Sequence, residues 1–304
     1  MKLGNDNDHT KLARFKSWRH TFWRVQSTPS ATLKVLTPDS LPQIWVKSIV
    51  WFAVGLFLFV VITSIQVNEA GVDFVTFYDA GRAVLHGVSP YTINGYYSPI
   101  HVAILSAPLS IFPLGVAYKV YVAVSVASWL WIASKMTSDK VTRLFLIFSP
   151  LVWLSMGCGN IEFLPLMALY TNPVIGAALA LAKPQMGIIL IALIIYRTKS
   201  LYPVLVVSGI MVVSYVLGMR VPDLTHETWN LSIFPIGVPV AIALTVYAMK
   251  HKDSLSALAS GVLMSTYVGP MSWVALAPLA SPKRRAAFVF WAISWVIAAW
   301  WGTR

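Results

Sequence analysis

The sequence predicts an all-α, polytopic integral membrane protein, and three observations support this fold class. Hydrophobic residues make up 57% of the 304-residue chain and charged residues only 11%, whereas soluble domains carry roughly 25% charged residues. The mean hydropathy of +0.70 comes from continuous apolar segments, which favour spanning helices over the alternating strands of a barrel. Basic residues gather in the loops between these segments, as they do on the cytoplasmic side of membrane proteins.

We expect two parts, a cytoplasmic basic tail at residues 1–43 and a transmembrane domain at residues 44–304. Phe15, Trp18 and Phe22 recur at helical spacing among the basic residues of the tail. This pattern predicts a short amphipathic helix on an anionic leaflet, and a solvated basic tail is the alternative. The tail lacks the apolar stretch and cleavage site of a signal peptide.

About 20 apolar residues are needed for a spanning helix, and residues 44–65 and 114–134 meet that length. The other apolar segments are shorter or interrupted by proline: 99–113, 144–156, 161–196 (broken at Asn172-Pro173 and Lys183-Pro184), 201–217, 231–249, 255–268, 273–280 and 286–301. We expect a bundle of about 8–10 transmembrane or re-entrant helices. Broken helices at membrane depth line cavities or are buried in protein, so an internal site is predicted.

Loop charge predicts the orientation, because Lys and Arg stay in the cytoplasm. The basic loops expected inside with the N-terminus are 135–143, 197–199, 250–253 and 283–285, and the acidic loops expected outside are 66–98 and 219–230. The simplest solution makes 99–113 shallow or re-entrant and 114–134 a crossing. It places Asp73 on the outer face with 157–162, 219–230 and 266–272. Two full crossings between Ser98 and Lys135 would invert everything downstream.

Asp73 and Asp79 are the carboxylates of interest in the outer loop at residues 66–98. If this stretch is helical, Asp79 and Arg82 can form an ion pair across one turn. Asp73 has no such partner, so we favour it as the functional acid, since an ionisable residue at a membrane cavity is costly to bury.

Lys183 lies in an apolar segment just before Pro184 and Gln185. It could hold a phosphate as a point charge, or it could extend to a nearby membrane interface. Asn160 could bind a ligand or cap the helix that follows. The aromatic residues Tyr91, Tyr96, Tyr97, Trp229 and Trp273 could stack on a sugar or form an interfacial belt.

Several other functions find no support in the sequence. Cys158 is the only cysteine, which excludes an intramolecular disulfide, and we read it as a small buried thiol. No His/Cys cluster has metal-ligand spacing, so we expect neither a bound metal nor another cofactor. The formal charge of +12 is explained by cytoplasmic loops at a membrane surface, and we expect membrane lipids rather than nucleic acid as partners.

Residues 73–91, DFVTFYDAGRAVLHGVSPY, resemble the first outer loop of glycosyltransferase family 87, a family of the membrane-embedded GT-C glycosyltransferases. Four further stretches resemble motifs of the family. The first is Tyr97-Ser98-Pro99 followed by Ala107-Pro108-Leu109, and the second is Gly157-Cys158-Gly159-Asn160, where the family has Gly-Gln-x-Asn. The other two are residues 176–185, which end in Lys183-Pro184-Gln185, and Pro270-Met271-Ser272-Trp273. These motifs keep the family's order across roughly residues 70–280. The chain is shorter than typical members, and Cys158 replaces or displaces the family's glutamine.

The resemblance implies a mannosyltransferase-like enzyme of a prokaryotic plasma membrane, with a polyprenyl-phosphate-linked hexose as donor and a lipid or glycan as acceptor. Asp73 matches the family's general base, and Lys183 would neutralise the departing phosphate. The reaction would invert the anomeric carbon. The residues expected to contact substrates are Lys183, Gln185, Asn160, Tyr78, Asp79, Arg82, Tyr97, Ser272 and Trp273.

Two other classes of protein remain open at this stage. A small transporter or flippase would explain the broken helices and a lysine at membrane depth, although the sequence shows no inverted repeat. A non-catalytic membrane subunit that keeps a GT-C-like fold would explain the altered motifs.

Overall fold

The computed structural model describes residues 70–220 and 230–302, and all regular elements within these ranges are helices. The all-α prediction is therefore confirmed for the described residues. The basic tail, the first expected span at residues 44–65, and most of the acidic loop at 219–230 lie outside them.

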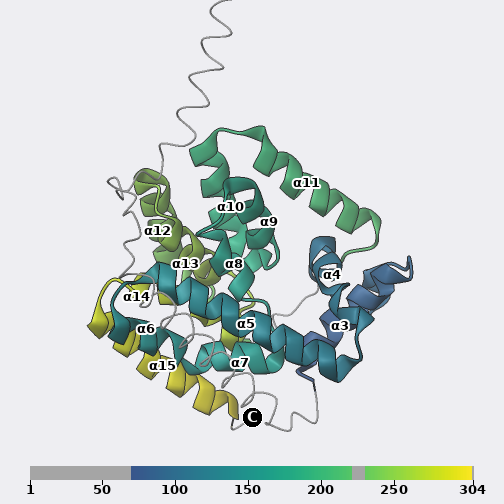
Figure 1. Cartoon of the computed structure of the whole chain (residues 1–304). Helices are drawn as coiled ribbons and strands as arrows, with labels where there is room; N and C mark the ends of the chain where they lie inside the picture. Colours follow the sequence, from purple (N-terminus) through teal and green to yellow (C-terminus); the bar gives the residue numbers. More distant parts are fainter. Residues whose placement is uncertain (1–69, 221–229, 303–304) are drawn as a thin grey trace, which may run out of the picture. The chain divides into compact units, whose positions relative to one another are not determined.

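Figure 1 labels most of the described elements. In order they are α3 (Val72–Leu85), η2 (Pro90–Thr92), α4 (Ile100–Ser106), η3 (Leu109–Ile111), α5 (Leu114–Met136), α6 (Lys140–Ile147), α7 (Pro150–Cys158), α8 (Phe163–Ala168), α9 (Pro173–Leu181), α10 (Pro184–Thr198), α11 (Leu201–Val216), α12 (Val238–His251), α13 (Ser254–Met264), η4 (Pro270–Leu276), α14 (Ala277–Ala280) and α15 (Arg284–Gly302).

The helix α5 matches the span predicted at residues 114–134. Within the described ranges it is the one helix long and apolar enough by itself to cross a membrane. The pair α6 and α7, bent by 41° where Phe148 and Ser149 separate them, would make a second span if counted together. The remaining apolar helices are shorter, so the expected number of 8–10 crossing or re-entrant helices stays a prediction.

New helices begin at the prolines where the sequence predicts a break. Pro173 and Pro184 each occupy the first position of a helix, α9 and α10, where proline's fixed φ fits and its missing N–H costs nothing. Asn172 caps α9 by accepting hydrogen bonds from the next turn of backbone N–H groups. Residues 99–113 form the short helix α4 and the turn η3 rather than one long helix, and a shallow or re-entrant position in the membrane stays a prediction.

The packing around α10 brings the middle of the chain together with its C-terminal part. The helix α10 packs against both α9 and α13 (Figure 1), and the turn η4 packs against α7 and α13. At the other side of this core, Phe74 of α3 lies with its ring centroid 5.2 Å from that of Tyr118 and 5.0 Å from that of Tyr121. These aromatic contacts hold the first turn of α3 against α5.

The basic loops predicted to share the cytoplasmic side meet in pairs. Asp139, before α6, forms an ion pair with Arg284 at the start of α15, with 2.6 Å between Oδ1 and Nη2. Arg197, near the end of α10, donates a hydrogen bond to Ser254 at the start of α13 over 3.1 Å. Members of each pair therefore lie close together, and the orientation argued from loop charge stays a prediction.

Candidate functional site

Asp73 lies at the second position of α3, where the chain enters its first helical turn. The aligned peptide dipoles at a helix N-terminus favour a negative charge there. The side chain of Asp73 is half-buried, and the neighbouring Phe74 is fully buried among the aromatic rings of α5. The helix therefore holds the carboxylate in a defined place at the edge of the core.

The turn at residues 157–160 lies directly against this end of α3. The helix α7 ends at Cys158, and Gly159 adopts the left-handed conformation with φ of 79°. A Cβ atom on Gly159 would lie only 2.3 Å from the Cβ of Phe74. Glycine is therefore required at position 159 both by the backbone conformation and by the close approach of α3. The turn places Asn160 within hydrogen-bonding distance of Asp73.

Asn160 joins the two segments through its amide. Its Nδ2 donates a hydrogen bond to Asp73 Oδ2 over 2.7 Å, and its Oδ1 accepts one from the Ile161 N–H over 2.9 Å. The buried Tyr121 hydroxyl donates to the Asn160 carbonyl oxygen. The helix α8 begins at Phe163 with Glu162 in the capping position, so the interpretation of Asn160 as a helix cap is wrong, and Asn160 serves Asp73 instead.

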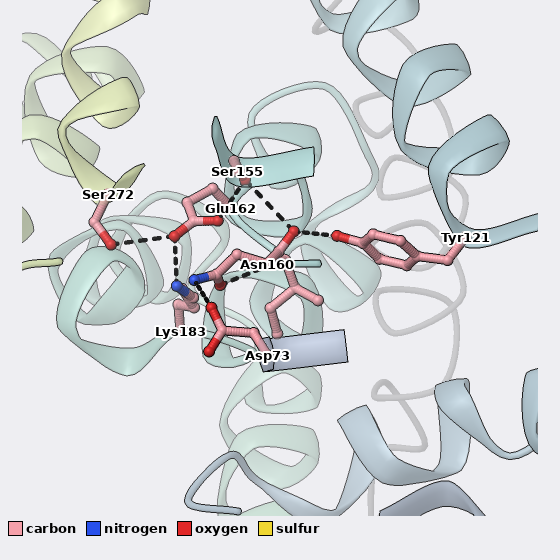
Figure 2. Close-up of polar contacts among 8 residues, drawn as sticks. Asp73, Tyr121, Ser155, Asn160, Glu162, Lys183 and Ser272 are labelled. Atoms are coloured by element: carbon pink, nitrogen blue, oxygen red, sulfur yellow. Dashed lines mark hydrogen bonds and ion pairs between the residues drawn. The ribbon is translucent and has the colours of Figure 1, made fainter. Parts of the chain in front are cut away.

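A buried ion pair lies beside this contact. Glu162 is 0% exposed, and its Oε1 accepts a hydrogen bond from Lys183 Nζ over 2.5 Å. Ser272 of η4 donates to the same oxygen over 3.3 Å, and Ser155 of α7 donates to Oε2 over 2.7 Å. Figure 2 shows Lys183 and Ser272 converging on Glu162 while Asn160 faces Asp73.

Lys183 is held by this pair rather than by a membrane interface. Its side chain is only 12% exposed and ends at Glu162, so the alternative in which Lys183 extends to the interface is wrong. Glu162 was not among the residues expected to contact substrates. A signal for it existed: Glu162 and Lys183 are the only charged residues in the apolar segment 161–196, and charges inside apolar segments are costly unless paired.

Burial is the main influence on Asp73, and it raises the pKa of that carboxyl above the ordinary 3.8. The charge of Lys183 and the hydrogen bond from Asn160 lower the pKa, while the charge of Glu162 raises it. Within the described residues no hydrogen bond is made to Oδ1 of Asp73. Asp73 thus combines an elevated basicity with one oxygen that is open to a proton.

Four of the residues expected at the site come together here: Asp73, Asn160, Lys183 and Ser272. The segment 157–162 therefore meets Asp73 through Asn160, and the segment 266–272 meets Glu162 through Ser272, while the predicted topology stays a prediction. Gln185 and Trp273 follow closely in the chain, but no contact with Asp73 or Glu162 places them in this cluster. Trp273 packs, partly buried, against the hydrophobic core.

The other expected residues lie away from this cluster. Tyr78 and Arg82 line a separate hollow further along α3, and the Tyr78 hydroxyl donates to the Phe112 carbonyl oxygen over 2.8 Å. The predicted Asp79–Arg82 ion pair is wrong, because the two side chains do not meet although they are three residues apart on a helix. Tyr97 is exposed in the loop after η2.

No group of three or more His, Cys, Asp or Glu side chains within residues 70–220 and 230–302 could hold a metal ion. The expectation that the protein works without metal stays a prediction. Comparison of the chain with known protein families, curated proteins and solved structures finds no match. Function therefore has to be argued from the cluster of Asp73, Asn160, Glu162 and Lys183.

Proposed function

We propose that the chain is a polytopic membrane glycosyltransferase of the GT-C type, resembling glycosyltransferase family 87. It transfers a hexose, with mannose the expected sugar, from a polyprenyl-phosphate donor to a lipid or glycan acceptor on the extracytoplasmic face. The observation that carries the proposal is the Asp73 carboxylate, with one oxygen held by Asn160 and the other open, beside the ammonium group of Lys183. Three motifs that lie far apart in the sequence supply these groups.

The outward faces of several helices support a location in lipid. On α11, Tyr215 is 80% exposed and Val216 is 77% exposed. Further large apolar side chains point outward on α12 and α15, among them Val240, Val246, Phe288, Ile293 and Val296. Exposed apolar patches of this extent favour contact with a membrane, and the helices that carry them are almost free of charged residues.

In the proposed reaction Asp73 Oδ1 accepts the proton of an acceptor hydroxyl while that oxygen attacks C1 of the donor sugar. The new C1–O bond forms as the bond between C1 and the phosphate oxygen breaks, and the electron pair leaves with the lipid phosphate. Attack from the side opposite the phosphate inverts the anomeric carbon. A carboxyl with a raised pKa is a better base for this step than an ordinary one.

Lys183 can assist the leaving phosphate even though it is paired. An ammonium group has three N–H donors, and Glu162 Oε1 takes one of them. The remaining donors can reach a phosphate oxygen and stabilise the charge that develops on it. Glu162, Ser155 and Ser272 then act as the frame that holds Lys183 in place.

The test is sugar transfer by the purified protein in lipid. The donor is radiolabelled polyprenyl-phosphate-mannose, the acceptor is a crude lipid extract from the host, and Asp73→Asn is assayed beside the wild type. Asp139→Asn is the matched control, because it makes the same change at a partly exposed carboxylate outside the cluster, where asparagine can still cap α6.

Label that reaches a new lipid or glycan with the wild type and with Asp139→Asn, but not with Asp73→Asn, supports the reaction and the base. Slow donor hydrolysis that depends on Asp73 supports a working site whose acceptor is missing from the extract. Transfer that survives Asp73→Asn contradicts the assignment of the base. No signal with several sugar donors contradicts the enzyme proposal and favours a non-catalytic subunit.

A further inference from the structure

An open hollow of about 410 Å³ lies beside the C-terminal half of α3, bounded on its other side by η3 and by Phe112 and Pro113, which precede α5. Arg82 and His86 are the basic side chains that line it. Arg82 lies in the last turn of α3 and His86 is the C-cap residue four positions later, so both side chains lie at this end of the helix. A hollow that presents two nitrogen-rich side chains together is suited to an anion.

The positive charge in this hollow is not neutralised within the described residues. Neither Arg82 nor His86 makes an ion pair or a side-chain hydrogen bond with any residue in 70–220 or 230–302. Asp79, three residues before Arg82 on α3, is the nearest acid in the sequence and does not pair with it. An arginine guanidinium offers five N–H donors in a planar fork that fits phosphate oxygens, and these donors remain open.

The polar groups in the wall of the hollow are already satisfied. The Tyr78 hydroxyl donates to the Phe112 carbonyl oxygen over 2.8 Å, and the Ser110 hydroxyl donates to the Tyr78 carbonyl oxygen over 2.7 Å. These bonds fasten η3 to α3 and make the wall rigid. Arg82 and His86 are consequently the side chains whose donors are available to a bound anion.

The rim of the hollow is apolar and exposed. Ile111 is 71% exposed and Phe112 is 47% exposed, and Ile104 and Leu105 of the preceding helix α4 are exposed too. A free phosphate ion would gain nothing from such a rim. An amphiphile would gain from both parts, because its charged headgroup meets the basic side chains while its acyl chains cover the apolar surface.

We propose that this hollow binds the headgroup of an anionic phospholipid, with the phosphate on Arg82 and His86 and the acyl chains on the Ile111 and Phe112 rim. The site is separate from the sugar-transfer site, since nine residues of helix place Arg82 about 13 Å from Asp73 along the axis of α3. The proposal rests on the membrane location argued above, but not on the transfer reaction. A phospholipid bound in this way would place α3 and η3 at the depth of the lipid headgroups.

The test measures lipid retention by native mass spectrometry of the full chain in detergent. The probes are dioleoyl phosphatidylglycerol, dioleoyl phosphatidylcholine and inorganic phosphate. The wild type is expected to retain one phosphatidylglycerol more tightly than any phosphatidylcholine, in which the choline cancels the phosphate charge. The pair of substitutions Arg82→Gln and His86→Gln together should weaken this retention roughly tenfold or more, because hydrogen bonds to a charged group are lost.

Two further variants make the outcome decisive. Arg285→Gln removes an exposed arginine elsewhere and should leave phosphatidylglycerol retention unchanged, while Arg82→Lys keeps the charge but loses the planar fork and should retain only part of the binding. Equal retention in the double variant and the wild type would overturn the proposal. So would displacement of phosphatidylglycerol by inorganic phosphate at similar concentration, which would make this a free-phosphate site.

The same measurement separates this proposal from the proposed enzyme activity. The variant Asp73→Asn should keep the retained phosphatidylglycerol although it loses sugar transfer. Loss of lipid retention in Asp73→Asn would contradict the separation of the two sites.

Discussion

Replacing Lys183 with methionine removes the one cationic partner that the described residues give to the buried Glu162 carboxylate. Glu162 is 0% exposed and would keep only the hydroxyls of Ser155 and Ser272, at 2.7 Å and 3.3 Å. Removing one partner of a buried ion pair costs about 3–5 kcal/mol, because the other charge is left uncompensated. We expect a loss near the lower limit, about 3 kcal/mol, since Lys183 is 12% exposed and both serines remain.

The double variant Lys183→Met with Glu162→Gln tests the reason for that loss. Removing both charges leaves no uncompensated carboxylate, so stability should return to within about 1–2 kcal/mol of the wild type. The resulting coupling energy between the two positions should then be at least about 1 kcal/mol, which is measurable for neighbouring residues.

Unfolding in mixed micelles with increasing sodium dodecyl sulfate, followed by circular dichroism of the helices, measures these differences. Lys119→Met is the matched control, because it makes the same change at an exposed lysine of α5 and should cost little. Equal stability of Lys183→Met and Lys119→Met would refute the view that the ion pair organises the core. Additive losses in the double variant would refute the coupling.

Three further predictions concern the site and the topology. Sugar transfer should rise with pH through an inflection above 3.8, because burial raises the pKa of Asp73 and only its charged form is a base. The same raised pKa means that the stability of the folded state falls as pH rises from 3.8 towards the folded pKa. Asp73→Asn should therefore be more stable than the wild type at pH 7 in the same unfolding assay. Gly159→Ala should destabilise the protein by at least about 1 kcal/mol and reduce transfer, because Gly159 has a φ of 79° and no room for a Cβ, whereas Gly157→Ala, with open space around it, should change neither; equal effects would contradict the role given to the turn. In a cysteine-free background, Asn94→Cys should react with an impermeant maleimide from outside the membrane and Arg285→Cys only from the cytoplasmic side, and labelling of both from one side would contradict the predicted orientation.

Local structure in this chain follows largely from the sequence. Proline can begin a helix but not continue one, so the breaks before Pro173 and Pro184 could be predicted without knowledge of the packing. The apolar run at residues 114–134 is long enough that α5 had few alternatives. The helix that carries Asp73 was less certain from the sequence, because residues 66–98 form a polar stretch in which a helix was only one possibility, and the structure shows α3 there.

The partners of the site residues depended on tertiary structure. Asn160 lies 87 residues from Asp73, and Lys183 lies 21 residues from Glu162. Such contacts are set by how α3, α7 and α10 pack, and no local propensity encodes them. The Asp79–Arg82 prediction failed for the converse reason, because spacing on a helix permits an ion pair but does not require one when both side chains can find other surroundings.

The amino-acid sequence was thus sufficient for the helical class and the helix breaks, because each depends on the composition or on a short stretch of chain, and it also singled out Asp73 as a candidate. Only the folded structure showed that Lys183 is paired with Glu162 and that Arg82 lines a hollow away from Asp73. Those facts depend on which buried charge lies within hydrogen-bonding distance of which donor. That distance is decided by the packing of helices remote in sequence.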